Sequence, residues 1–404
     1  MTGRAGPLVA LRNGEFRAMW AAEALSQGGD QLARVALSVL VFTSTSSVTL
    51  AALAFGLSYT PSLVGSVLLA GLADRFPRRE VMVACDLVAA ALLVVMALPG
   101  TPTWLLCVAM AGVALVGGPF KAARLALLPD VLTGEAYPAG LALRSITIQL
   151  AQLIGFAGGG ALVAMVGPHV ALAVDAATFL VSAALVRLGV RARRAPGDPA
   201  TRRPFWASSL DGARAIGAIP GLPALFVLGM LAGLYIAPEG LGAAWVAEMA
   251  APAWAVGLVM GAPAAGLVVG AWLFTAAVPP TYRDRLVGPL AVFSGIALVA
   301  CAVRPGLWVT LLCLVLSGVC TAFQVQVGAS FGLLAPRASR AQVMGLLNSG
   351  VITAQGIGVL LAGAVAEVIG VARTVAVAGA VGALLAVPTG LSWARASAAR
   401  AAVT

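Results

Sequence analysis

The chain has 404 residues, of which 61% are hydrophobic and only 10% are charged, and its mean hydropathy is +1.00. Its 25 basic and 15 acidic side chains cannot cover the surface of a water-soluble body of this size, so the bilayer must be the solvent. The net charge of +10 does not indicate nucleic-acid binding, because the basic residues lie in short gaps between apolar runs.

Apolar runs long enough to cross a hydrocarbon core of about 30 Å recur along the whole chain. They predict an all-α membrane protein with about twelve transmembrane helices. The predicted spans are residues 16–42, 48–73, 81–98, 103–121, 139–166, 170–190, 223–246, 253–277, 286–303, 306–330, 341–367 and 372–393. Under this count the arginine-rich gaps fall on one side, which predicts a multi-pass protein of the cell (inner or plasma) membrane with both termini cytoplasmic.

The longest polar break, residues 191–222, is rich in Arg, Pro and Gly and predicts a cytoplasmic linker. It separates an N-terminal six-helix bundle, residues 1–190, from a C-terminal six-helix bundle, residues 223–404. The two halves carry a similar series of residues, and a chance similarity between Ala-, Gly- and Leu-rich helices is the alternative. The matched positions are Leu127, Leu128, Gly140, Gly155 and Gly167 in the first half and Leu333, Leu334, Gly345, Gly358 and Gly370 in the second. Two related six-helix halves are typical of secondary transporters, whose binding site lies between them.

The first span carries a polar stripe formed by Glu23, Gln27, Asp30 and Arg34, at helical spacings of i, i+4, i+7 and i+11. Each ionisable group at the centre of a membrane costs about 2.5–3.5 kcal/mol on insertion scales, so the stripe must face an aqueous cavity or polar partners. We therefore expect it to line a transport pathway.

The members of this stripe should have different roles. Asp30 and Arg34 are one turn apart and can pair, which suggests a breakable gate or a contact to substrate. Glu23 has no basic residue at i±3 or i±4, so burial should favour its protonated form and make it the carrier of a coupling proton. The alternative is a static polar network that holds the first span to its neighbours.

Further polar residues within spans are candidate pathway contacts: Arg144, Gln149, Gln152, Asn348 and Gln355. They could equally bond helix to helix at about 1 kcal/mol each. Gln324 and Gln326 have the same two interpretations. Asp86 and Asp175 read instead as structural residues.

An intramembrane enzyme would need a nucleophile with a base or a metal set, and the single histidine, His169, comes with no H-E-x-x-H or G-x-S-x-G pattern. We therefore expect no catalytic residues, no metal and no cofactor. A receptor would not need an acidic stripe along a pathway. The absence of a G-x-x-x-x-G-K-[ST] motif indicates that energy comes from an ion gradient or from the substrate's own gradient.

The segment Ala70-Gly71-Leu72-Ala73-Asp74-Arg75-Phe76-Pro77-Arg78-Arg79 closely resembles the G-x-L-A-D-R-x-G-R-R loop of the major facilitator superfamily. Ala70 and Pro77 stand where that motif has glycine. The resemblance implies a fold of two pseudo-symmetric six-helix halves and a cytoplasmic latch at the functional positions of the motif: Asp74, Arg75, Arg78 and Arg79. If these arginines were only topology anchors, Asp74 would have no explanation.

A second set of segments is similar to the drug:proton antiporter group that includes enterobactin-exporter-like and macrolide-efflux proteins. The segments are Phe16 to Trp20, Ser26 to Asp30 with Arg34, Arg124 with Pro129 and Asp130, and Asp175 to Phe179. Gly155 to Gly160 resembles the G-P-x-x-G-G antiporter signature, with Phe156 in place of proline. Arg124 and Asp130 join the expected latch through this resemblance.

This second resemblance implies export of an amphipathic small molecule, of antibiotic or siderophore type, by proton antiport. Uptake by proton symport is the alternative. The expected partners are the small-molecule substrate, protons and the lipid bilayer, with no nucleic acid, and we expect a monomer.

Overall fold

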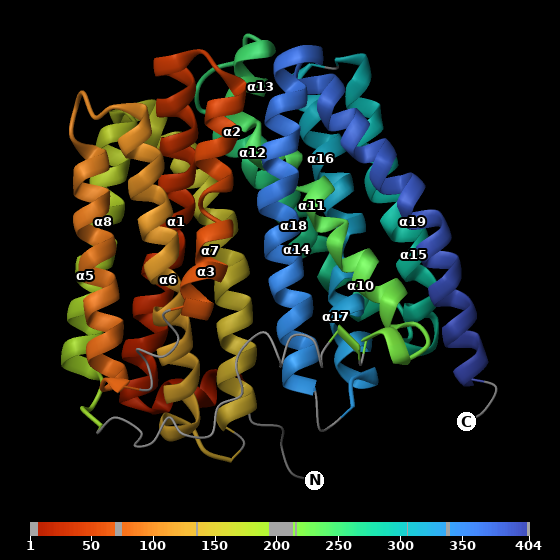
Figure 1. Ribbon diagram of the computed structural model, residues 1–404, viewed down its shortest axis with the longest axis horizontal. Helices are drawn as coiled ribbons and strands as arrows, with labels where there is room; N and C mark the ends of the chain where they lie inside the picture. The colour runs from red at the N-terminus through yellow and green to blue at the C-terminus, as the bar shows by residue number, and fades with distance from the viewer. Residues whose placement is uncertain are drawn as a thin grey trace. The chain divides into compact units, whose positions relative to one another are not determined.

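The computed structural model describes residues 7–68, 75–134, 136–193, 213–214, 216–304, 306–336 and 340–401. Within these ranges the chain forms helices and no strand, which confirms the all-α class. The chain divides into two compact units, Met1–Ser44 with Leu57–Arg202 and Thr45–Gly56 with Arg203–Thr404. The long helices of each unit run alongside one another as a bundle (Figure 1).

The described residues of the first unit form a short 3-10 helix and six α-helices. They are η1 (Pro7–Arg12), α1 (Gly14–Thr45), α3 (Thr60–Leu68), α5 (Arg78–Ala97), α6 (Thr103–Val131), α7 (Ala136–Val166) and α8 (Pro168–Gly189). Most of the predicted linker, residues 194–212, lies outside the described residues.

The second unit contains α2 and the helices of the C-terminal half. They are α2 (Val48–Gly56), α10 (Leu222–Met230), α11 (Ala232–Tyr235), α12 (Ala237–Gly240), α13 (Gly242–Glu248), α14 (Ala255–Ala277), α15 (Pro280–Val299), η2 (Ala300–Val303), α16 (Leu307–Thr321), α17 (Phe323–Leu334), α18 (Arg340–Ile369) and α19 (Val371–Ala401). The predicted seventh span is therefore broken into four short helices, α10 to α13.

Ten helical segments of the described chain are long and apolar enough to cross a membrane, which makes this a multi-pass membrane protein. The first two predicted spans do not belong to those ten. α1 has 32 residues but carries Glu23, Asp30 and Arg34, while α2 and α3 have 9 residues each and a turn between them. The ten segments are consistent with twelve spans once these two polar or interrupted spans are added.

α6 extends ten residues beyond the predicted end of its span at Lys121, to Val131. Lys121, at the predicted end of the span, and Arg124, beyond it, are therefore both residues of this helix. The hydropathy pattern placed the end of this span too early, because two basic side chains lower the mean hydropathy even when they remain inside a helix.

Small residues bring the helices close together in both units. In α3, a Cβ on Gly65 would collide with the backbone of Leu115 in α6. In the second unit, Gly266 of α14 and Gly318 of α16 meet backbone to backbone. Such contacts are typical of helices in lipid, where close packing replaces the hydrophobic driving force.

Gly167 and Gly370, which the sequence comparison of the two halves had paired, occupy equivalent turns. Gly167 ends α7 with a φ of 83°, and Gly370 ends α18 with a φ of 86°. Each donates its N–H to the carbonyl four residues earlier, on Val163 and Ala366. Both turns need a positive φ, which glycine adopts without a steric penalty.

Candidate transport site

The centre of the first unit holds a buried ionic triad that joins three helices. Glu23 of α1 is 2% exposed. Its Oε1 lies 2.9 Å from Nη2 of Arg124 in α6, and Nε of Arg144 in α7 donates to both carboxylate oxygens at 2.8 Å. Phe16 and Leu128 lie beside the triad, so these charges interact in a medium of low polarity.

The triad corrects two sequence expectations. Glu23 was expected to lack a basic partner, but it has two, separated from it by 101 and 121 residues along the chain. Arg124 was expected in the latch with Asp130, but it is buried and faces Glu23. One carboxylate thus bonds to two guanidinium groups and ties α1 to α6 and α7 through charge-assisted contacts.

A cavity of about 60 Å³ lies inside the same unit, large enough to admit water. Its charged lining comes from three helices: Asp30 and Arg34 of α1, Asp86 of α5, and Lys121 and Arg124 of α6. Gln27 also lines it, whereas Glu23 does not.

Arg34 does not form the expected ion pair with Asp30. Its Nη1 donates to Oε1 of Gln31 and to the hydroxyl of Tyr59, both at 3.1 Å, and the guanidinium carbon lies 4.6 Å from the Tyr59 ring centre. Asp30 forms no hydrogen bond or ion pair with the described residues, although it lines the cavity together with Lys121. Asp30 therefore faces the cavity without a direct contact to Arg34 or Lys121.

Two further acids, missed as functional candidates in the sequence, lie deep in this unit. Asp86 is 1% exposed, lines the cavity and accepts a 2.7 Å hydrogen bond from Oγ of Ser182 in α8. Asp175 is fully buried, with Oδ1 bonded to Oγ1 of Thr178 at 2.9 Å and Oδ2 without a partner in the described chain. The sequence could have marked both acids as functional candidates, because an ionisable group inside an apolar span usually has a function.

Gly29 allows Asp175 to approach the backbone of α1. A Cβ at Gly29 would collide with the Asp175 carboxylate and with Oγ1 of Thr178, whereas a Cβ at Gly28 would meet nothing within 4 Å. Gly29→Ala should therefore destabilise the protein by about 1–3 kcal/mol through overpacking. Gly28→Ala is the matched control and should be neutral or slightly stabilising, because alanine favours a helix. Equal thermal unfolding temperatures for the two variants would contradict this packing.

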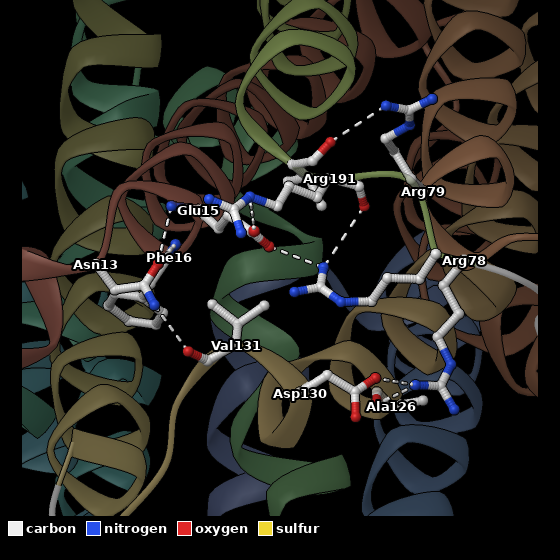
Figure 2. A network of polar contacts seen from close by, with 11 residues as sticks. Asn13, Glu15, Phe16, Arg78, Arg79, Ala126, Asp130, Val131 and Arg191 are labelled. Carbon is white, nitrogen blue, oxygen red and sulfur yellow. Dashed lines mark hydrogen bonds and ion pairs between the residues drawn. The ribbon is translucent and has the colours of Figure 1, made fainter.

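The motif loop contributes an exposed ion pair at one end of the unit. Nη1 of Arg78 lies 2.7 Å from Oδ2 of Asp130 and donates to the carbonyl of Ala126 as well (Figure 2). Arg79 bonds to Glu80 and to the carbonyl of Val190. Asp74 lies outside the described residues. Arg75 is exposed.

The other predicted pathway residues are not gathered around this cavity. Gln149 and Gln152 are half-buried on α7 and do not line it. Asn348 and Gln355 belong to α18 of the second unit, where Asn348 is exposed.

The remaining two glutamines bond between helices. Gln324 donates to the carbonyls of Leu228 and Gly229, and Gln326 donates to Oδ1 of Asp284 at 2.8 Å. These contacts match the structural alternative for both side chains. In the part of the chain that the structure describes, no three His, Cys, Asp or Glu side chains are grouped as a metal site requires.

A family profile described as Major Facilitator Superfamily matches residues 19–281, the greater part of the chain. The chain belongs to the major facilitator superfamily. It is therefore a transporter and not an enzyme. A search of curated protein sequences finds no significant match.

Solved major facilitator structures share this fold. A POT family transporter in complex with a thioalcohol-conjugated peptide aligns with a TM-score of 0.76 at 13% identity, covering 94% of this chain and 96% of that one. A bacterial homologue of the human lysosomal transporter Spinster, inward-facing and occupied, aligns with a TM-score of 0.74 at 15% identity over 95% and 96% of the chains. At these identities the likeness establishes the fold alone.

Proposed function

We propose that this transporter exports an amphipathic small molecule by proton antiport with alternating access. The observation that supports this best is the cavity in the first unit, where Asp30 and Asp86 share a lining with Lys121 and Arg34. One proton added to either acid changes the charge balance of that cavity. Such a change can be coupled to the departure of a substrate. The drug:proton antiporter resemblance of the N-terminal half favours export.

The triad changes which residue should carry the proton. Glu23 is bonded to two guanidinium groups and does not line the cavity, so its contacts hold α1 to α6 and α7. Asp86 has no cation within ion-pair distance among the described residues and has only the Ser182 hydroxyl as a partner. We therefore assign proton coupling to Asp86 and Asp30, gating to Arg34, and a positioning role to Glu23.

The latch and the orientation complete this proposal. Arg78 and Asp130 join the start of α5 to the end of α6, and the contact is exposed enough to break and form again. The arginines at this end of the bundle favour a cytoplasmic location for it by the positive-inside rule, with both termini on that side.

Uptake of a small zwitterion is the second candidate. It is favoured by the two signs of charge in the cavity lining, which could bind an ammonium and a carboxylate together. Another POT family structure, solved in complex with 5-aminolevulinic acid, gives the same fold with a TM-score of 0.75 at 13% identity, over 94% of this chain and 96% of that one.

Everted membrane vesicles with an imposed pH gradient distinguish the two candidates. The proposal predicts that vesicles containing this protein accumulate a member of a panel of antibiotics and siderophores, and that accumulation stops when the gradient is collapsed. Accumulation that survives the collapse would contradict proton antiport. Gradient-driven accumulation of amino acids or short peptides in right-side-out vesicles would instead establish uptake.

A further inference from the structure

A second cavity, of about 660 Å³, lies at one end of the first unit between the starts of α1 and α5 and the end of α8. Three arginines line it: Arg79, Arg187 and Arg191. Figure 2 shows Arg79 and Arg191 at this place, with Glu15 in contact with Arg191. The latch contact of the proposed transport cycle, Arg78 with Asp130, does not line this cavity.

The charge of this cavity is positive even after its internal ion pairs are counted. Glu15 pairs with Arg191 at 3.1 Å and with Arg193 at 2.8 Å, while Glu80 pairs with Arg79 and Arg187. Four guanidinium groups thus share two carboxylates, which leaves a net charge of +2. The Arg187 and Arg191 side chains remain 53% and 86% exposed, so they retain unused N–H donors.

The position of the cavity indicates which anion it fits. Two apolar spans have their ends here, since α5 begins at Arg78 and α8 ends at Gly189. Lipid phosphates lie at this depth of a membrane. Guanidinium groups match phosphate oxygens through two parallel hydrogen bonds, better than an ammonium group does.

One apolar side chain favours a lipid over a free phosphate ion as the occupant of this cavity. Leu188 lines the cavity and is 86% exposed. A free phosphate ion would gain nothing from a leucine wall, but the glycerol and upper acyl chains of a lipid would cover it. We propose that this cavity binds the phosphate headgroup of an anionic phospholipid, with Arg187 and Arg191 as its main contacts and Leu188 against its apolar part.

Native mass spectrometry of the purified full-length protein in detergent tests this site. The probes are phosphatidylglycerol, phosphatidylcholine and inorganic phosphate. We expect phosphatidylglycerol to be retained more tightly than phosphatidylcholine. Arg187→Gln/Arg191→Gln should weaken its binding by roughly 30-fold, since each surface arginine contributes about fivefold. Arg191→Gln alone, at the most exposed position, should weaken it by several-fold without changing the unfolding temperature.

The matched control is Arg12→Gln/Arg17→Gln, which removes two exposed arginines near the same end of the bundle that do not line the cavity. It should leave phosphatidylglycerol binding close to the native value. Equal losses in the two double variants would reveal a diffuse basic surface and overturn the site. Equal retention of the two lipids would overturn it as well. Inorganic phosphate that binds as tightly as the lipid would make this a free-anion site instead.

Discussion

Replacing Glu23 by glutamine should lower the free energy of unfolding by about 3–5 kcal/mol, because it leaves the buried Arg124 and the partly buried Arg144 without their counterion. Thermal unfolding of the purified protein in detergent measures the loss. The double variant Glu23→Gln/Arg124→Gln should recover part of it, since it also removes the most buried uncompensated charge.

Glu15→Gln is the matched control for this prediction. Glu15 lies on the same helix and also pairs with two arginines, but those arginines, Arg191 and Arg193, have side chains that are 86% and 33% exposed. Ion pairs with exposed partners contribute about 0–1 kcal/mol each, so Glu15→Gln should change stability by much less. If Glu23→Gln were as stable as Glu15→Gln, the triad would stabilise this unit no more than the exposed ion pairs of Glu15 do.

The second large effect should appear in transport, not in stability. Asp86→Asn preserves the size of the side chain and an acceptor for Ser182, but asparagine cannot take up or release a proton. We expect transport driven by a pH gradient to fall to background in this variant. Exchange of labelled for unlabelled substrate should persist, because it requires no net movement of protons.

Asp284→Asn provides the control in the second unit. Asp284 also accepts a serine hydroxyl, from Ser330 at 2.8 Å, but it belongs to a contact between α15 and α17 and not to the cavity. Transport by the Asp284→Asn variant should therefore depend on the pH gradient as transport by the native protein does. If Asp86→Asn and Asp30→Asn both kept native pH-driven transport, the acids of the cavity would not carry the proton.

The features that could be predicted from the sequence are those with a local or repeated signature. Apolar runs predicted most of the spans, and the Asp74 to Arg79 motif pointed to the superfamily. The series of residues repeated in the two halves includes Gly167 and Gly370, each of which follows a long helix and has a positive φ.

The partners of Glu23 could not be predicted in the same way. Helical spacing considers only neighbours three or four residues away, whereas Arg124 and Arg144 reach Glu23 from two other helices. The predicted span ended at Lys121, whereas α6 continues past Arg124 to Val131, because basic side chains lower the mean hydropathy even inside a helix. Tertiary contacts decided the environment of each of these groups.

The most direct test of proton antiport is the pH inside proteoliposomes that contain the purified protein and a substrate gradient but no imposed pH gradient. The substrate is the compound identified in the vesicle panel. The account predicts that protons move against the direction of substrate flow, and that Asp86→Asn abolishes this pH change. Protons that move in the same direction as the substrate would establish symport, and substrate flow without a pH change would contradict proton coupling.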